Sequence, residues 1–303
     1  MTSSHKPKGS LYLCLNALLC TLLWGSAIPL IRLASSEYDS QELSSHIAFA
    51  GIRFTLAGMM ALLFIKKPLK ALNKAPWGLL LTCTVFQIYL QYLLFYWGLK
   101  ISPAVLVASL VSSGSFWWVI LAPMVDKTQS IRPAQFLWLI IGALGVTLCL
   151  NHKGSMEGSV FGGLLIIGAT LCGTIAALTV RPIHQRGISM PLLTGFALFI
   201  GGILLCLSAP RATYTIITHM NLKLGCITLY LAFTSVAAFS LWYKLITLYD
   251  VTRMSAYRMF IPVFGVLISI LILPDEHLSW QVFIGGGILL LSVAALERSK
   301  QKI

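Results

Sequence analysis

The stretch LYLCLNALLCTLLWGSAIPLIRL, residues 11–33, contains a single charged side chain, that of Arg32. A helix that crosses the hydrocarbon core of a bilayer needs about 20 predominantly apolar residues, so this stretch is long enough to span. Lys6 and Lys8 precede it as they would in a signal peptide, but the apolar run continues past any cleavage point near Ala27. We therefore predict an uncleaved first membrane span.

Apolar stretches of this kind recur along the whole chain. They lie near residues 11–33, 46–65, 77–98, 102–125, 132–150, 159–180, 190–208, 222–246, 251–273 and 280–296. The composition agrees with them, because 57% of the residues are hydrophobic and only 10% are charged, against about 25% charged in soluble proteins. We predict an all-α integral membrane protein with ten transmembrane helices and short connections.

The distribution of Lys and Arg predicts the orientation. With ten spans, thirteen Lys and Arg lie on the side of the amino terminus and five on the opposite side. Cytoplasmic loops carry the excess of positive charge, so both termini, residues 1–10 and 297–303, are predicted to be cytoplasmic tails of a multi-pass plasma-membrane protein. The net charge of +13 then reflects topology, and no basic stripe predicts binding to nucleic acid.

The second half of the chain repeats the first. At an offset of 148 residues, Trp24-Gly25-Ser26 aligns with Cys172-Gly173-Thr174, and an offset of 147 aligns the later spans. The repeats are residues 11–150 and 159–296, with five spans each. Because five is odd, the second repeat enters the membrane from the opposite side, and such inverted-topology repeats are typical of secondary transporters.

Four short motifs carry a family resemblance. They are Leu23-Trp24-Gly25-Ser26, Arg53-Phe54 followed by Ala57, Ile261-Pro262-Val263-Phe264, and Asp275-Glu276-His277-Leu278-Ser279 running into Gly285. In order and spacing they resemble the EamA-type transporters of the drug/metabolite transporter superfamily, over essentially the whole chain. The resemblance implies two bundles of five helices around a central cavity, and transport of small organic solutes by alternating access. The first repeat departs from the family pattern at Ser115, Gln129 and Trp138, where the family usually has Pro, Glu and Gly.

Four cations lie inside or near the ends of the apolar stretches, namely Arg53, Lys244, Arg253 and Arg258, and no acid lies clearly inside one. Such cations are costly in a membrane and usually face the bundle interior or a wet cavity. Arg53 and Arg258 each have two interpretations, a cation that binds substrate and a structural arginine. Lys244 either points into a vestibule or snorkels to the headgroups, as Arg253 does.

If two of these cations line one cavity, that cavity attracts an anionic group. We predict Arg258, Arg53 and Lys244 as substrate-binding residues, together with Trp24 of the first motif and Tyr257 beside Arg258. Polar side chains at membrane depth complete the predicted lining, although close helix packing explains them equally well. These side chains are Gln87, Gln91 and Ser113.

Two prolines are predicted hinges. Pro29 and Pro262 lie within predicted spans, where a proline removes one helical hydrogen bond. For Pro262 the carbonyl that loses its bond is that of Arg258, so a kink is expected beside this cation.

The sequence lacks motifs for catalysis, metals or cofactors. No HExxH, P-loop or dinucleotide fingerprint is present, so we expect neither an enzyme nor a cofactor or metal site. We predict a secondary transporter of a small anionic or zwitterionic organic metabolite, such as an amino acid, with the bilayer and the solute as partners. A monomer is compatible with this reading. The alternatives are an exporter of aromatic or amphipathic compounds and a non-transporting receptor or assembly partner on the same fold.

Overall fold

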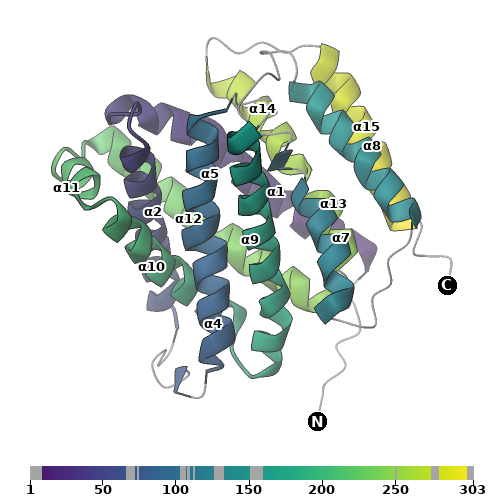
Figure 1. Cartoon of the computed structure of the whole chain (residues 1–303), viewed down its shortest axis with the longest axis horizontal. Coiled ribbons are helices and arrows are strands. Elements are labelled where there is room, and N and C mark those ends of the chain that lie inside the picture. The colour runs from purple at the N-terminus through teal and green to yellow at the C-terminus, as the bar shows by residue number, and fades with distance from the viewer. Residues whose placement is uncertain are drawn as a thin grey trace.

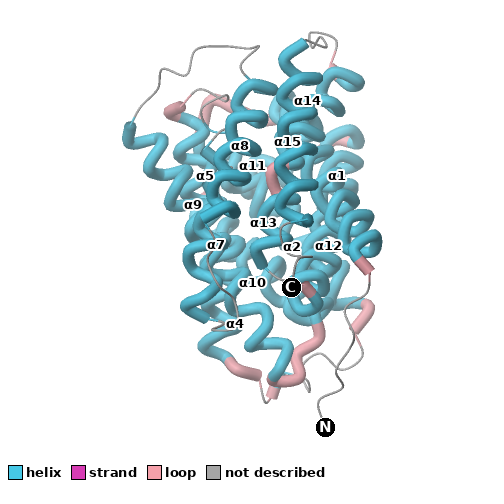
Figure 2. The backbone as a smooth tube through the Cα atoms, turned by 90° about the vertical axis from the view of Figure 1, so that its right-hand side faces the viewer, coloured by secondary structure: helices cyan, strands magenta, loops and turns pink. Residues whose placement is uncertain are grey.

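The computed structural model describes residues 9–65, 72–73, 75–102, 107, 110–111, 113–125, 133–150, 160–249, 251–273 and 280–298. Helices account for all regular structure in these ranges, and no strand occurs among them (Figure 2). Most of the two predicted tails, Gln129 and the predicted acidic turn at 275–279 lie outside the described residues.

The helices follow one another with short connections. Their bounds are α1 Ser10–Ala34, η1 Ser35–Glu37, α2 Leu43–Leu63, α4 Trp77–Thr84, η2 Val85–Leu90, α5 Gln91–Lys100, α7 Ser113–Val125, α8 Pro133–Leu150, α9 Val160–Gln185, α10 Met190–Ser208, α11 Pro210–Thr218, α12 Leu222–Leu248, α13 Val251–Tyr257, α14 Phe260–Ile272 and α15 Trp280–Arg298.

Seven helical stretches of the described chain are long and apolar enough to cross a membrane. They are Ser10–Glu37, Leu43–Leu63, Trp77–Lys100, Val160–Gln185, Met190–Ser208, Leu222–Leu248 and Met254–Ile272. Two shorter apolar helices, Pro133–Leu148 and Phe283–Ala295, accompany them. The prediction of an all-helical, multi-pass membrane protein is therefore confirmed.

Hydroxyl side chains within these helices bond to their own backbone. Thr84 Oγ1 donates to the Leu80 carbonyl at 2.8 Å, and Thr228 Oγ1 donates to the Leu224 carbonyl at 2.7 Å. An unpaired hydroxyl in hydrocarbon is costly, and the carbonyl four residues back is the nearest acceptor along a helix. Threonine is thereby tolerated at membrane depth.

Helices from the two halves of the chain pair with one another. Of the helices in the first half, α2 packs along α10 and α8 packs along α15 of the second half. Likewise, α1 contacts both α12 and α14, and α5 contacts α9. Figure 1 shows α8 and α15 side by side at one edge of the molecule, with α2, α10 and α11 at the other. A Cβ added at Gly58 would lie 2.2 Å from the Phe199 backbone nitrogen, so glycine permits the close α2–α10 approach.

α11 is an element that the sequence analysis did not predict. Its nine residues are too few for a span, and Pro210 at its first turn has the φ angle that starts a helix. Ile216 is the buried residue of α11 and faces the packed bundle, where α11 contacts α2 and α10. The helix is amphipathic, but it is too short and too polar to stand out as an apolar stretch in the sequence.

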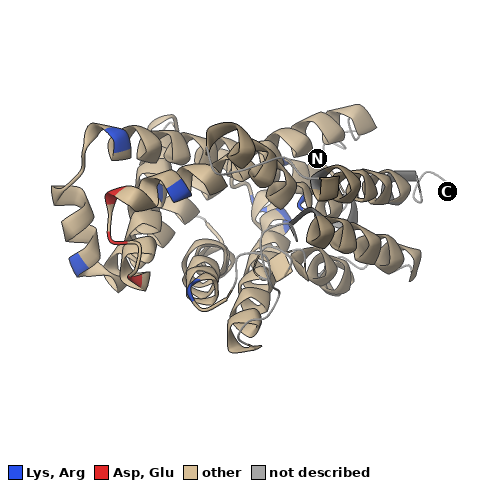
Figure 3. Ribbon diagram, turned by 90° about the horizontal axis from the view of Figure 1, so that it is seen from above, with Lys and Arg blue, Asp and Glu red and all other residues tan. Residues whose placement is uncertain are grey.

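The described acidic side chains gather in the connection between α1 and α2 (Figure 3). Glu37 forms an ion pair of 2.6 Å with Lys223 and accepts a 2.7 Å hydrogen bond from Asn221 Nδ2. In the same region Lys100 donates to the Gln41 carbonyl. The α1–α2 connection is therefore tied to α5 and to the beginning of α12.

Candidate functional site

Arg53 is a buried cation held against aromatic rings. It lies in the middle of α2, where its side chain is 4% exposed. Its Cζ is 4.3 Å from the centroid of the Phe54 ring and 5.7 Å from that of Tyr92 on α5. Arg53 Nε has no hydrogen-bond partner among the described residues, so this guanidinium retains a donor for an incoming acceptor.

Arg258 lies where the predicted ninth span is interrupted. α13 ends at Tyr257 and α14 begins at Phe260. In this break the Arg258 amide donates to the Ser255 carbonyl at 3.3 Å, and the Arg258 carbonyl accepts from the Ile261 amide at 3.1 Å. Bonds between residues three apart tighten the turn. Arg258 is half-buried, and its Cζ is 5.4 Å from the centroid of the Trp118 ring.

Tyr92 lies within electrostatic range of both arginines. Its ring centroid is 5.7 Å from Arg53 Cζ. Its ring lies edge-on to Phe54, with the ring centroids 4.6 Å apart. Arg53 comes from the first half of the chain and Arg258 from the second, so cations from both halves lie within electrostatic range of the same tyrosine.

Three tryptophans form an aromatic row beside this pair. The ring centroids of Trp24 on α1 and Trp242 on α12 are 5.3 Å apart, and those of Trp242 and Trp118 on α7 are 6.2 Å apart. The Nε1 atoms of Trp24 and Trp118 are buried and have no hydrogen-bond partner among the described residues. A buried indole N–H usually has a partner, and these two can therefore donate to an acceptor on a bound molecule.

Gln87 lies on a π-helical turn in the predicted third span, and Gln91 follows that turn directly as the first residue of α5. The turn, η2, is Val85–Leu90, and such turns occur frequently at functional sites. Gln87 Nε2 donates to Gln91 Oε1 at 2.8 Å. An added Cβ at Gly173 of α9 would lie 2.5 Å from Gln91 Oε1, so the glycine leaves room for the amide. Ser113 bonds across to α9, with its Oγ 3.0 Å from Thr170 Oγ1.

The remaining predicted residues have different surroundings. Tyr257 is buried at the end of α13, next to Arg258. Lys244 is exposed on α12, which agrees with the interpretation that it snorkels. Pro29 is buried within an α1 helix that continues past it to Ala34, whereas Pro262 is buried in the first turn of α14 after the break. Substrate binding and hinge motion at these positions stay predictions.

Of the rings described above, sequence reasoning predicted Trp24 as a binding residue and missed the others. Phe54 entered only as the neighbour of Arg53 in a family motif, Trp242 has no unusual neighbours in sequence, and Tyr92 and Trp118 stand out only as flanks of polar residues. Their grouping depends on how α2, α5, α7 and α12 pack.

In the described part of the chain, no group of three or more His, Cys, Asp or Glu side chains is placed to bind a metal.

We call the group formed by Arg53, Arg258, Tyr92, Trp24, Trp118 and Trp242 the cation–aromatic cluster. It offers positive charge, ring faces and unpaired N–H donors within a helical membrane bundle. A chemistry of this kind suits recognition of a solute, because donors and cations are the partners of an anion.

The comparisons with known proteins agree with this architecture. The chain matches the EamA-like transporter family over residues 11–151 and again over residues 160–297. A solved crystal structure, described only as that of a protein, shares the fold with a TM-score of 0.73 at 16% sequence identity, covering 95% of this chain and 98% of the other. No curated protein matches. The chain therefore belongs to the EamA-like transporter family, a group of membrane transporters of the drug/metabolite type, and the predicted family is confirmed.

Proposed function

We propose that this protein is a secondary transporter of a small anionic or zwitterionic organic metabolite, which it moves across the plasma membrane by alternating access. The observation that carries the proposal is the placement of two cations among buried aromatic rings, Arg53 beside Tyr92 and Arg258 beside Trp118, with Tyr92 in electrostatic range of both. The buried polar atoms of the cluster that lack partners are N–H donors, those of Arg53, Trp24 and Trp118. Donors left unpaired at depth are costly, and an acceptor-rich solute relieves that cost when it binds.

Alternating access is supported by how the helices pair. Counting α4–η2–α5 and α13–α14 each as one span gives ten spans in two sets of five. The second helices of the sets, α2 and α10, then pair with each other, as do the fifth helices, α8 and α15. The pairing of α1 with α12 corresponds to that of α9 with α5. Such reciprocity is expected of inverted repeats that rock against each other.

Ligand-induced thermal stabilisation of the purified protein tests the proposal. We expect anionic or zwitterionic solutes in a panel of amino acids, organic acids and phosphorylated metabolites to raise the Tm, since a ligand bound only to the folded state stabilises it by mass action. In Arg258→Gln the affinity should fall by about 10- to 100-fold, the equivalent of one hydrogen bond to a charged group.

Arg211→Gln is the matched control, because Arg211 is exposed on α11 and outside the cluster. This variant should keep the wild-type response. Stabilisation by cations alone, or equal stabilisation of wild type and Arg258→Gln, would refute an anion site at the cluster. A stabilising solute should then show saturable, trans-stimulated movement in proteoliposomes, and its absence would favour a non-transporting receptor.

The row Trp24–Trp242–Trp118 favours a second candidate, an exporter of aromatic or amphipathic compounds. Ring faces bind planar or cationic compounds without help from an arginine. For this function, aromatic compounds should stabilise the wild type and Arg258→Gln equally. Their effect should be lost in Trp242→Leu, and the same panel therefore separates the two candidates.

A further inference from the structure

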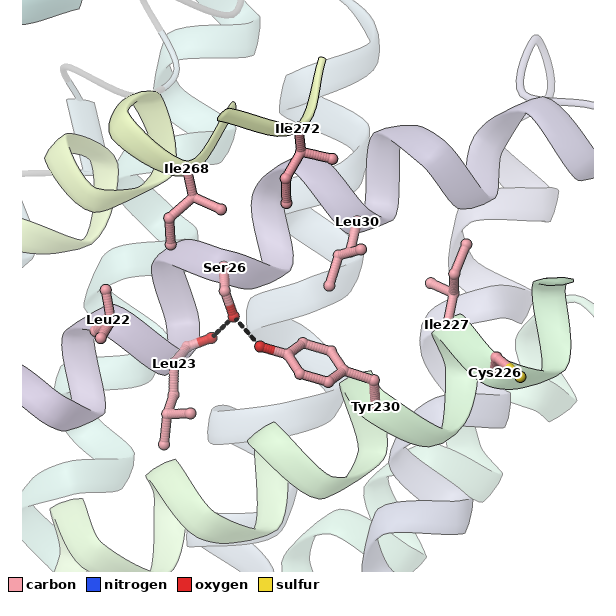
Figure 4. A pocket seen from close by; sticks show the side chains of 9 residues that line it. All are labelled: Leu22, Leu23, Ser26, Leu30, Cys226, Ile227, Tyr230, Ile268 and Ile272. Carbon is pink, nitrogen blue, oxygen red and sulfur yellow. Dashed lines mark hydrogen bonds between the residues drawn. The ribbon is translucent and has the colours of Figure 1, made fainter. Parts of the chain in front are cut away.

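A groove of about 580 Å³ lies outside the cation–aromatic cluster, between α1, α12 and α14 (Figure 4). α1 belongs to the first half of the chain and the other two helices to the second, so the groove follows the seam between the halves. Nine residues line it, namely Leu22, Leu23, Ser26, Leu30, Cys226, Ile227, Tyr230, Ile268 and Ile272.

The hydroxyl groups in the groove are bonded within the protein. Ser26 Oγ donates to the Leu23 carbonyl at 2.8 Å and lies 3.0 Å from the Tyr230 hydroxyl oxygen. With the Ser26 hydrogen used on the carbonyl, the Tyr230 hydroxyl donates to Ser26. Both hydrogens are thereby used, and the remaining lining is aliphatic except for the Cys226 thiol. The occupant of the groove therefore needs an apolar surface and no hydrogen-bonding groups.

The groove lies at hydrocarbon depth. Ser26 is eight residues before the end of α1, and Tyr230 is eight residues after the beginning of α12, which places both about 12 Å along the helices from the same surface. All three helices belong to stretches able to cross a membrane. The apolar side chains of Leu229 and Leu271 on α12 and α14 are 54% and 83% exposed, as is typical of residues that face lipid.

We propose that this groove binds one acyl chain of a membrane phospholipid from the leaflet on the side of the α1–α2 connection. The groove runs from Leu30 and Ile272, near the ends of their helices, to Leu22 at greater depth. A hydrocarbon chain inserted lengthwise fits this course. Trp24 projects from α1 to Trp242 of α12, within the cation–aromatic cluster, so the groove and the cluster share α1 and α12 but no lining residue.

Photo-crosslinking tests the occupant. The full chain is reconstituted into phosphatidylcholine vesicles that contain a phospholipid with a diazirine in one acyl chain, and adducts are mapped by mass spectrometry after illumination. We expect adducts concentrated on residues 22–30, 226–230 and 268–272. Ile268→Trp fills the groove and should lose them. Leu271→Trp, on the same helix but outside the lining, should keep them.

Other outcomes overturn the proposal. Adducts spread evenly over all lipid-facing helices would show that no acyl chain is held in the groove. Chain-to-chain crosslinks at these residues would assign the groove to a second copy of the protein, and protection by a transported solute would assign it to substrate. If Ile268→Trp does not fold, Leu30→Trp fills the groove from α1, and the adduct map of the wild type decides independently of either variant.

Discussion

Arg53 and Arg258 are cations at membrane depth whose described contacts are with aromatic rings. A buried cation–π contact contributes about 2 kcal/mol, whereas placing an arginine near the middle of a span costs about 2.5–3.5 kcal/mol. The ring contacts at 4.3 Å and 5.4 Å therefore offset most of the cost of each charge but not all of it. A bound anion would supply the difference, and this supports the proposed substrate class.

At the same scale, Gly173 tests whether Gln91 contributes to binding. Gly173→Ala places a Cβ 2.5 Å from the present position of Gln91 Oε1, so the amide must move and its bond with Gln87 should weaken. We expect the affinity for the stabilising solute to fall by about 10-fold, the equivalent of one hydrogen bond of roughly 1.4 kcal/mol, as measured by the shift in Tm with ligand concentration.

Gly168→Ala on the same helix is the control. Its added Cβ would be 3.6 Å from Leu94 Cδ1, an ordinary contact. Unchanged affinity in both variants would remove Gln91 from the binding site and leave it as a packing residue.

At the scale of the element, the break between α13 and α14 determines where Arg258 points. Pro262 cannot donate to the Arg258 carbonyl, and the Ile261 amide takes that acceptor instead. The π turn in η2 has a similar effect on the third span, because an extra residue in the turn changes the face on which Gln91 lies.

Pro262→Ala should therefore favour fusion of the two helices. The new amide can bond to the Arg258 carbonyl, and the ligand-free Tm should stay the same or rise, since proline is the poorest helix former. Moving Arg258 should at the same time weaken stabilisation by the anionic solute and slow its transport. Comparing ligand-free Tm with transport rate in proteoliposomes tests the hinge. Normal transport with an unchanged Tm would mean that no hinge motion occurs at this break.

At the scale of the whole molecule, the Glu37–Lys223 ion pair joins the two halves on the side of the α1–α2 connection. We predict that it helps to close that side. Lys223 is 54% exposed, and an exposed pair contributes at most about 1 kcal/mol. Glu37→Gln should thus leave Tm almost unchanged while shifting the equilibrium between closed and open forms by up to about fivefold.

Spin labels at residues 36 and 220, in a Cys226→Ser background, report that equilibrium as a distance distribution. The exchanged pair Glu37→Lys with Lys223→Glu should restore the closed form, whereas Asp39→Asn removes an equal charge from the same connection and should have no effect. A distribution unchanged in Glu37→Gln would exclude the ion pair as a closing contact.

The orientation of the chain is a separate prediction at this scale. Because thirteen Lys and Arg lie on one side of the ten predicted spans and five on the other, the carboxyl terminus should be cytoplasmic. A green fluorescent protein fused there should fluoresce, and alkaline phosphatase should be inactive. Fusion after Lys100 should give the reverse pattern. An active phosphatase at the carboxyl terminus would contradict the predicted topology.

The sequence by itself determined that this is a helical membrane protein of the EamA-like family. Long apolar stretches must form helices in a bilayer, because the backbone polar groups have no other partners there. The motif around Trp24 and Gly25 is also visible in the sequence, but the reason for its glycine is tertiary, since a Cβ on Gly25 would lie 2.7 Å from Phe264 Cβ of α14. The length of an apolar stretch, by contrast, depends on consecutive residues and can be read from the chain.

The tertiary structure alone decided which polar and aromatic residues meet. Trp242 and Tyr92 are ordinary aromatic residues in sequence, and they become partners of Trp118, Arg53 and Arg258 only through packing between α5, α7 and α12 and their neighbours. The same holds for the lipid-facing groove. In a membrane every face of a span can be apolar, so hydrophobic periodicity does not show which face packs against protein and which faces lipid.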